Sequence, residues 1–471
     1  MRRLLLLLGL AYLGYCKTVD AQVAMPAFFS DHLVLQQQSK AKIWGTALSK
    51  KEIKIQTSWD NQTYTTKADD RGNWEITVKT ASAGGPFNIN ISQQNKIILK
   101  DVLLGEVWLC SGQSNMDMPV KGYHGLPIIN SLDMMMESPD SLLRLFKVER
   151  KYAAVPETDV KGTWQLADAA SVASFSAVGY QFASYLRKQL GVPVAMIQAT
   201  WGGSPIEAWM DRKLVGDVLK DHLISNPAIS KAVHQVPGNL YHGMISPLIG
   251  YPIAGVIWYQ GEQNRHNYAD YLTLQRAMVS AWRTQWNIGD WPFYLVQLAP
   301  MKYASHEASK VPLLREAQLK LPDTLANAGV AVIIDAGEEH NIHPANKTIP
   351  SKRLAYLALA KTYHKKGFPV SSPTYQKMVV KNDTASVYFN QAPLGLTTYG
   401  KTITQFEIAA ADQVFYPATA SLVNNVVKVY SDKVKQPIAI RYAFKDWAVG
   451  ELFSVEGLPI SSFRTDNWTI K

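Results

Sequence analysis

The pattern of hydrophobic and polar positions divides this chain into three regions. From residue 22 to residue 101, short runs rich in Val, Ile and Thr alternate with polar turns, as in "KAKIWGTA" and "KEIKIQTSW". A period of two residues is typical of strands that bury one face, and "DDRGN" has the composition of a hairpin turn. We therefore expect a small antiparallel β-sandwich over residues 22–101.

The middle region, residues 102–370, has a different period. Apolar runs such as "LLGEVWLC", "VPVAMIQAT" and "IAGVIWYQ" alternate with amphipathic segments such as "GYQFASYLRKQL" and "YLTLQRAMVSAWRTQW". Strands that are apolar on both faces and separated by helices are typical of a parallel sheet covered on both sides. The pattern predicts an α/β domain, with further strands at "WPFYLVQLA" and "AGVAVIIDA".

Residues 371–471 return to strand-like patterns. The runs "KMVVKNDTASVYFN" and "SLVNNVVKVYSD" carry β-branched residues and are separated by Asn, Asp and Gly. These features predict a C-terminal antiparallel β-rich region that packs on the middle domain.

The first 21 residues have the pattern of a secretory signal peptide. Two arginines precede an apolar run, and small residues lead to a cleavage site after Ala21. We expect an exported protein, in the periplasm or outside the cell, with a lipid anchor on Cys16 as the alternative. No other segment is long and apolar enough to predict a membrane span.

Charge and composition exclude several classes of function. The formal net charge is +10, but the lysines are dispersed and no basic run stands out, so nucleic acid is not expected as a partner. There is no P-loop and no GxGxxG fingerprint, and we expect no cofactor. A cluster of acids and histidines has no recognised zinc spacing, and we expect no metal there; its members are Asp335, Glu338, Glu339, His340 and His343.

Polar, glycine-bearing loops follow four of the predicted central strands. They are Ser111–Asn115, Trp201–Pro205, Gly261–Asn264 and Ile342–Pro344. Ligands of open parallel sheets bind beyond the carboxyl ends of the strands. Each loop alone could be a turn, but together they predict one site at one edge of the sheet.

The residue types in these loops fit acyl transfer. Ser114 is placed at the start of a helix, where it would serve as a nucleophile, and His343 is the best candidate for its base. The backbone N–H of Ser114 or Gly203 and the side-chain amide of Asn264 could stabilise an oxyanion, each donor contributing about 2.7–4 kcal/mol in the transition state.

Three further side chains of these loops are predicted to contact the substrate. They are Gln113, Gln260 and Trp201. The alternative for the tryptophan is a place in the core or in a pocket wall.

Five motifs occur in order along the middle region: "GQSNM", "WGGSPIEAWM", "NLYHGMISPL", "WYQGEQN" and "IHPANK". This set resembles the sialate O-acetylesterase family of the SGNH-hydrolase clan, and "LPISSFRTD" resembles its trailing β-region. The resemblance implies an SGNH-type sheet as the catalytic domain. It also implies hydrolysis of a sugar O-acetyl ester through an acetyl-serine, with Ser114 and His343 as the pair and Gly203 and Asn264 as oxyanion donors.

One position departs from the clan's pattern. Many SGNH enzymes carry an acid two or three residues before the catalytic histidine, where this chain has Asn341 and His340. Either Ser114 and His343 act as a dyad, or a carboxylate comes from elsewhere. Glu262 is the leading candidate for that orienting acid, ahead of Glu338 and Asp335.

Three hypotheses for the function follow. The first is an exported sialate O-acetylesterase. The second keeps the chemistry on acetylated xylan or another polysaccharide, and the third is a carbohydrate-binding protein with an inactive core. An arginine that binds the sialate carboxylate would favour the first, yet Arg265 and Arg212 are only weak candidates, since a solvated surface role suits both.

Overall fold

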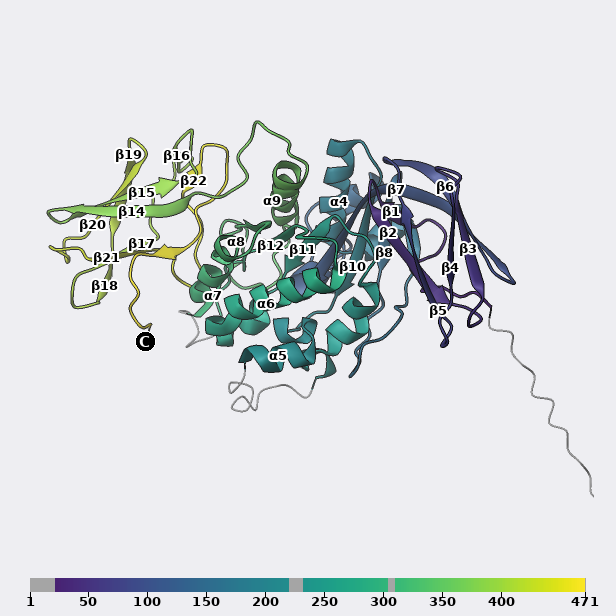
Figure 1. Ribbon diagram of the computed structural model, residues 1–471. Helices are drawn as coiled ribbons and strands as arrows, with labels where there is room; N and C mark the ends of the chain where they lie inside the picture. Colours follow the sequence, from purple (N-terminus) through teal and green to yellow (C-terminus); the bar gives the residue numbers. More distant parts are fainter. Residues whose placement is uncertain (1–21, 220–231, 304–309, 471) are drawn as a thin grey trace, which may run out of the picture.

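The computed structural model describes residues 22–219, 232–303 and 310–470, in which two β-rich regions flank a central α/β unit (Figure 1). The N-terminal strands lie at one end of the molecule and the C-terminal strands at the other. The predicted signal peptide and Cys16 lie outside the described residues. The α/β fold class with flanking antiparallel modules is confirmed.

The N-terminal region consists of short strands whose residues alternate between buried and exposed. In β3 (Glu52–Thr57), for example, Ile53 and Ile55 are fully buried between exposed neighbours, as the period of two predicts. The other strands are β1 (Val34–Gln36), β2 (Lys40–Thr46), β4 (Thr63–Lys67), β5 (Asn73–Lys79) and β6 (Gly84–Ser92). Strand β3 pairs with β4 and β6, and β2 pairs with β5, all antiparallel.

A single long strand, β7 (Lys96–Gly112), joins the N-terminal region to the central sheet. Its first part runs antiparallel to β6, and Leu103–Gly105 pairs with β1. Its last part, from Glu106 onward, pairs in parallel with β10 (Val194–Thr200) and β11 (Gly255–Tyr259). The boundary expected between residues 101 and 102 therefore falls inside one continuous strand.

The central sheet has the order β13-β12-β11-β7-β10-β8-β9. All neighbours are parallel except β9, which is antiparallel to β8. The outer strands are β8 (Asp140–Lys147), β9 (Trp164–Ala167), β12 (Phe293–Val296) and β13 (Ala328–Ala331). Strands β8 and β9 were not among those expected from the sequence.

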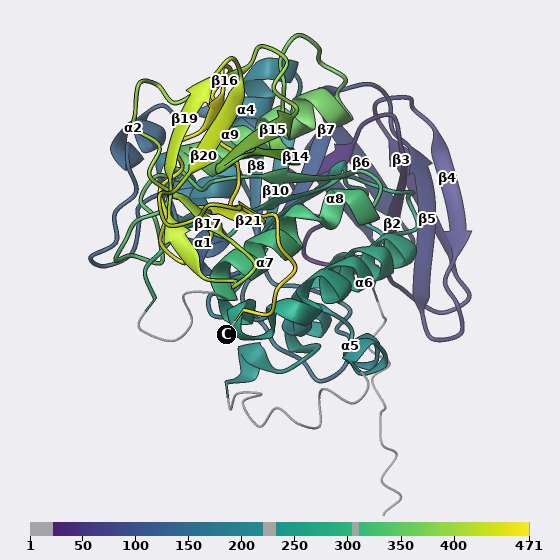
Figure 2. The same ribbon diagram turned by 90° about the vertical axis from the view of Figure 1, so that its left-hand side faces the viewer.

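Helices cover both faces of this sheet (Figure 2). Alternate residues of β7 belong to two different hydrophobic cores. Trp108 and Cys110 pack with α4 (Ala177–Leu190) and α9 (Thr348–Leu357), whereas Val107 and Leu109 belong to the core that contains α6 (Tyr268–Trp286). The remaining helices are α1 (Ser114–Asp117), α2 (Ser131–Met136), α3 (Ala169–Ser174), α5 (Arg212–Leu219), α7 (Lys310–Leu319) and α8 (Leu321–Thr324).

The ends of α4 illustrate why these segments are helical. The Ser176 hydroxyl accepts a hydrogen bond from the N–H of Gly179, and Gly191 ends the helix with a φ of 72°. A serine N-cap satisfies a backbone donor that the first turn leaves free, and glycine adopts the left-handed conformation without steric cost.

The C-terminal region forms small antiparallel sheets from ten short strands within the described residues. They are β14 (Thr374–Lys381), β15 (Thr384–Asn390), β16 (Leu396–Thr397), β17 (Phe406–Ala409), β18 (Phe415–Pro417), β19 (Thr419–Val423), β20 (Val426–Tyr430), β21 (Ala439–Tyr442), β22 (Phe453–Ser454) and β23 (Phe463–Arg464). Within the described ranges, no helix is both long and apolar enough to cross a bilayer.

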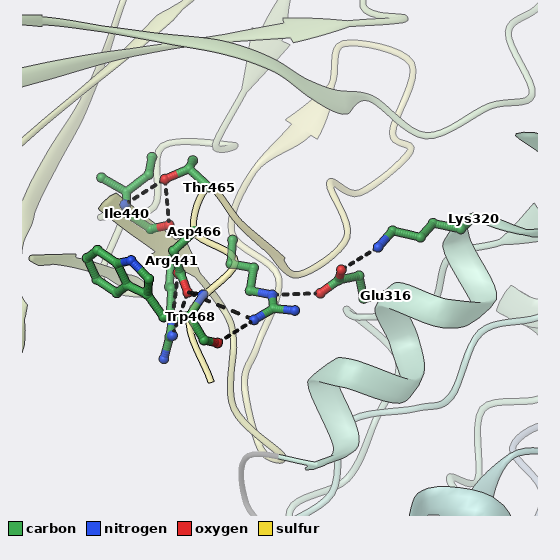
Figure 3. A network of polar contacts seen from close by, with 8 residues as sticks. Glu316, Lys320, Ile440, Arg441, Thr465, Asp466 and Trp468 are labelled. Carbon is green, nitrogen blue, oxygen red and sulfur yellow. Dashed lines mark hydrogen bonds and ion pairs between the residues drawn. The ribbon is translucent and has the colours of Figure 1, made fainter. Parts of the chain in front are cut away.

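Polar contacts fix this region to α7. Arg464 donates to Glu316 at 2.9 Å, and Glu316 also accepts from Lys320 (Figure 3). Beneath them, the fully buried guanidinium of Arg315 donates to the carbonyls of Leu298, Lys445 and Asp446. One buried side chain thus holds backbone from both regions.

We expect Arg315→Met to lower the free energy of unfolding by about 2–3 kcal/mol, because buried carbonyls would lose charged donors. Urea denaturation followed by tryptophan fluorescence measures this change. Lys320→Ala is the matched control. Its pair with Glu316 is half-exposed, and such pairs contribute about 0–1 kcal/mol. Equal effects of the two substitutions would contradict the role given to Arg315.

Candidate active site

The register of the central strands brings the predicted loops to one edge. Gly112 is paired with Thr200 of β10 and with Tyr259 of β11. The three strands therefore end at the same level, and the segments that follow them meet. This alignment places Ser114, the Trp201–Ser204 turn and Glu262 around one point of the carboxyl edge.

Gly112 is where the chain leaves the sheet toward Ser114. Its φ is +133°, and a Cβ there would lie 2.2 Å from the Tyr259 carbonyl oxygen. Only glycine fits both the conformation and the close approach. Ser114 then begins the one-turn helix α1, two residues after the end of β7, and is half-buried.

The glycine that faces Ser114 is Gly202. A Cβ on Gly202 would lie 3.3 Å from the Ser114 Cβ. Gly203, the predicted oxyanion donor, has a φ of +71° and faces His234, and its carbonyl accepts from Gln235. The role of the Gly203 N–H stays a prediction, while Gly202 is a residue that the sequence analysis did not single out.

The side chain of Asn115 ties three loops of the site together. Its Nδ2 donates to Glu262 Oε1 at 2.5 Å and to the carbonyl of Ile342 at 2.9 Å. Its Oδ1 accepts from Lys347 Nζ at 2.5 Å. Every hydrogen-bonding group of a fully buried amide is therefore used to hold the nucleophile segment against the segments that carry Glu262 and His343.

Both charged partners of Asn115 are buried. Burial lowers the pKa of Lys347 to about 7, while the carboxylates of Glu262 and Glu338 oppose that shift. Burial raises the pKa of Glu262, against the hydrogen bond from Asn115 and the charge of Lys347. The Lys347 ammonium also lies 5.8 Å from the centre of the Tyr259 ring, within the range of a cation–π contact.

His343 lies on a turn in which Glu338 accepts hydrogen bonds from residues on both sides of the histidine. Glu338 accepts from the Asn341 side chain at 3.0 Å and from the backbone N–H of Ala345 at 2.6 Å. Asn341 in turn accepts from the N–H of His343 at 2.9 Å. Burial, and then the positive charge of Lys347, lower the pKa of His343, which favours a neutral imidazole.

The acids proposed to orient His343 have other partners in this structure. Among the described residues, no hydrogen bond joins the His343 ring to Ser114 or to a carboxylate. Glu262 is bonded to Asn115, and its second oxygen is buried without a partner in the described ranges. Asp335 forms a two-bond ion pair with Arg353. The orienting role of Glu262 stays a prediction, since among the described residues its carboxylate is linked to the segment of His343 through Asn115.

Asn264, the predicted side-chain oxyanion donor, is buried and fully bonded. Its Nδ2 donates to Glu207 at 2.8 Å and to Asn267 at 3.2 Å. Its Oδ1 accepts from Gln260 and from the backbone N–H of Ile206. Donation to an oxyanion would require one of these partners to be exchanged, and the role stays a prediction.

The three residues predicted to contact substrate differ in their surroundings. Gln113 is buried, and its Oε1 accepts from two backbone N–H groups at the start of the 3₁₀ helix Glu262–Asn267. Gln260 is also buried and bonds to Ser204 and Tyr271. Trp201 is half-buried and stacks on His234 at 5.6 Å. Of the three, Trp201 is the one open to a ligand.

Asn115, Lys347 and Gly202 all belong to motifs quoted from the sequence. The resemblance pointed to these segments, but adjacency in the chain does not reveal which side chains meet across loops. A lysine four residues after the predicted base is, in sequence, indistinguishable from a solvated lysine.

Fold and site together define an ester hydrolase whose serine lies at the carboxyl edge of a parallel sheet. The chain belongs to the carbohydrate esterase family of sialic acid-specific acetylesterases, whose model matches residues 104–360.

Known proteins resemble the chain over most of its length. The crystal structure of a carbohydrate acetylesterase from Xanthomonas citri is 34% identical, has a TM-score of 0.87, and matches 95% of this chain and all of its own. Sialate O-acetylesterase from Rattus norvegicus is 25% identical, with 78% of each chain covered. The Homo sapiens sialate O-acetylesterase is 25% identical over 89% of this chain and 87% of its own.

We expect the activity to fall at acid pH with a midpoint below the ordinary imidazole value of about 6.5, because a protonated His343 cannot accept the serine proton. Lys347→Met should move this midpoint up by roughly half to one pH unit, since a like charge that lowers the pKa is removed. Profiles of kcat/KM against pH with 4-nitrophenyl acetate measure both values. The control Lys302→Met removes an exposed lysine paired with Glu339 and should leave the midpoint in place. An unmoved midpoint in Lys347→Met would refute the effect of the Lys347 charge on the pKa of His343.

Gly202→Ala should lower kcat/KM roughly tenfold to a hundredfold, because a methyl group beside the Ser114 Cβ would displace the nucleophile. Gly216→Ala is the control, since a Cβ at Gly216 on α5 meets no atom within 4 Å. Esterase kinetics and circular dichroism on both variants make the comparison. Full activity in a folded Gly202→Ala protein would contradict the close approach of Gly202 to the Ser114 side chain.

Proposed function

We propose that this protein is an exported sialate O-acetylesterase that removes O-acetyl groups from sialic acid through an acetyl-serine intermediate. The observation that carries the proposal is the pair of hydrogen bonds that the Asn115 side chain forms with Ile342 and Lys347. They hold the Ser114 segment against the segment of His343. Two groups that are far apart in the chain are thereby brought to one edge of the sheet.

In the proposed reaction, the Ser114 oxygen attacks the acetyl carbonyl carbon and His343 takes the serine proton. The oxyanion that forms is stabilised by the N–H groups of Ser114 and Gly203, with Asn264 as the predicted third donor. The sugar oxygen then leaves with the proton from His343, and the acetyl group stays on Ser114. In the second half of the reaction, His343 takes a proton from water, and the water oxygen attacks the acetyl carbon. The serine oxygen then leaves with the proton from His343, and acetate is released.

The local chemistry supports these roles. Ser114 is the first residue of α1, and the start of a helix favours developing negative charge. The lowered pKa of His343 keeps the imidazole in the form that accepts a proton at neutral pH. Glu338 holds the turn of His343 through Asn341 and Ala345, which fixes the backbone that carries the proposed base.

The choice of sugar rests on the family. The matching family model describes sialic acid-specific acetylesterases, and two of the mammalian relatives are named for the same reaction. Export rests on the arginines, apolar run and small residues at the start of the sequence. Acetylated xylan or another polysaccharide remains the alternative substrate.

Acetate release should be measured from O-acetylated sialic acids and, in parallel, from acetylated xylan. We expect release mainly from sialate, and a fall of at least about a thousandfold in Ser114→Ala, because removal of the nucleophile leaves only residual catalysis. Ser280→Ala, an exposed serine on α6, should keep full activity. A fluorophosphonate should label the wild type and not Ser114→Ala.

The outcomes separate the hypotheses. Release mainly from xylan would keep the esterase mechanism and overturn the sialate substrate. Absence of both hydrolysis and labelling would favour the non-catalytic carbohydrate-binding protein.

A further inference from the structure

An arginine follows strand β8 at the same edge of the sheet as Ser114. Arg150 Nη2 donates to Asp117 Oδ2 at 2.5 Å, and Asp117 lies on α1, one turn after Ser114. The Asp117 carboxylate is buried, and it also accepts from Thr200 and Tyr123. The guanidinium is therefore fixed relative to the helix that begins with the nucleophile.

The strand order places the end of β8, from which Arg150 follows, to one side of the nucleophile strand. Strand β8 pairs with β10, and β10 pairs with β7, so the end of β8 lies two strand spacings from the nucleophile strand. Two spacings amount to roughly 10 Å. His343 follows β13, which lies beyond β11 and β12 on the other side of β7.

Arg150 is partly exposed and lies against Trp201, near the nucleophile. Its guanidinium carbon lies 5.7 Å from the centre of the Trp201 ring, and Trp201 directly precedes Gly202, which faces Ser114. Half of the Arg150 side chain is exposed (50%), whereas Asp117 is only 4% exposed. The arginine is anchored at one nitrogen and still open to solvent.

Positive charge exceeds negative charge around Asp117. Burial lowers the pKa of Lys147, the last residue of β8; the Asp117 carboxylate opposes that shift, and the charges of Arg150 and Lys121 add to it. Two cations thus interact with one buried carboxylate, and a third lies near Lys147. An arginine that remains accessible in such surroundings suits a planar anion that accepts two hydrogen bonds.

We propose that Arg150 is the specificity-determining residue that binds the carboxylate of an anionic acetylated sugar, an inference that rests on the proposed sialate esterase function. Sialic acids carry a carboxylate at one end and a hydroxylated side chain at the other. With the carboxylate on Arg150, the sugar spans the Trp201 wall and presents an ester of that side chain to Ser114. Arg265 and Arg212 have other partners. Arg212 is bonded to Pro237 and Asn239, and Arg265 lies over the Tyr303 ring.

The test compares an O-acetylated sialic acid with its methyl ester, which has the same acetyl group and no carboxylate charge. We expect the wild type to prefer the acid in kcat/KM by about tenfold or more, as a charge-assisted hydrogen bond provides. Arg150→Gln should abolish that preference, mainly through KM for the acid. Arg150→Lys keeps the charge without the fork and should restore part of it.

Thr200→Val is the matched control, because it removes another hydrogen bond to the Asp117 carboxylate and leaves the bond between Arg150 and Asp117 Oδ2 in place. It should keep the wild-type preference for the acid. If Thr200→Val loses the preference as Arg150→Gln does, Arg150 acts only by supporting Asp117 and the inference is overturned.

Two further outcomes are distinct. A wild-type preference for the acid that survives in Arg150→Gln would overturn the role of Arg150 and leave the proposed function intact. A wild type without activity on either sialate, yet with Ser114-dependent release from acetylated xylan, would overturn both proposals.

Discussion

The hydrogen bonds of the Asn115 side chain are the constraint on which the geometry of this site depends. Strand pairing fixes where β7 ends, but it fixes nothing about the turn of His343, which follows the far strand β13. Asn115 supplies that relation directly, because its Nδ2 donates to the carbonyl of Ile342 and its Oδ1 accepts from Lys347 Nζ. A buried amide with all of its bonds made has few alternative arrangements. The position of the nucleophile relative to the base is thus set one residue away from the nucleophile itself.

Strand β7 determines where that amide lies. It is shared by the N-terminal region and the central sheet, so the sandwich and the site are built on one rigid element. Its pairing ends at Gly112 against β10 and β11 together, and a side chain at Gly112 would overlap the Tyr259 backbone. A shift of register by one residue would exchange the side chains that β7 presents to the two cores on its opposite faces. Packing of the core therefore fixes the register of β7, and with it the position at which the chain leaves the sheet toward Ser114.

The sequence was sufficient for the fold class and for the convergence of the loops, because both depend on local periodicity and on strand order. It did not predict β8, since "SLLRLFK" contains a charged residue and breaks the continuous apolar run expected of a central strand. Arg144 is nonetheless buried there, with its charge paired to Asp101. Because β8 was missed, Arg150 at its end was not considered as a candidate. Contacts between loops, such as those of Asn115 and Glu338, have no local signature and appear only in three dimensions.

Burial decides what each cation near the site can do. Lys347 is almost fully removed from water, and such an ion is retained only where its hydrogen bonds are satisfied. Asn115 accepts one hydrogen bond from Lys347 and donates another to Glu262, and the positive charge of Lys347 lowers the pKa of His343. Arg150 differs from Lys347 in its exposure. One bond to Asp117 anchors it, while half of its side chain is exposed to solvent. The buried cation can act only on the protein's own groups, whereas the exposed one is free to meet a charge that the substrate brings.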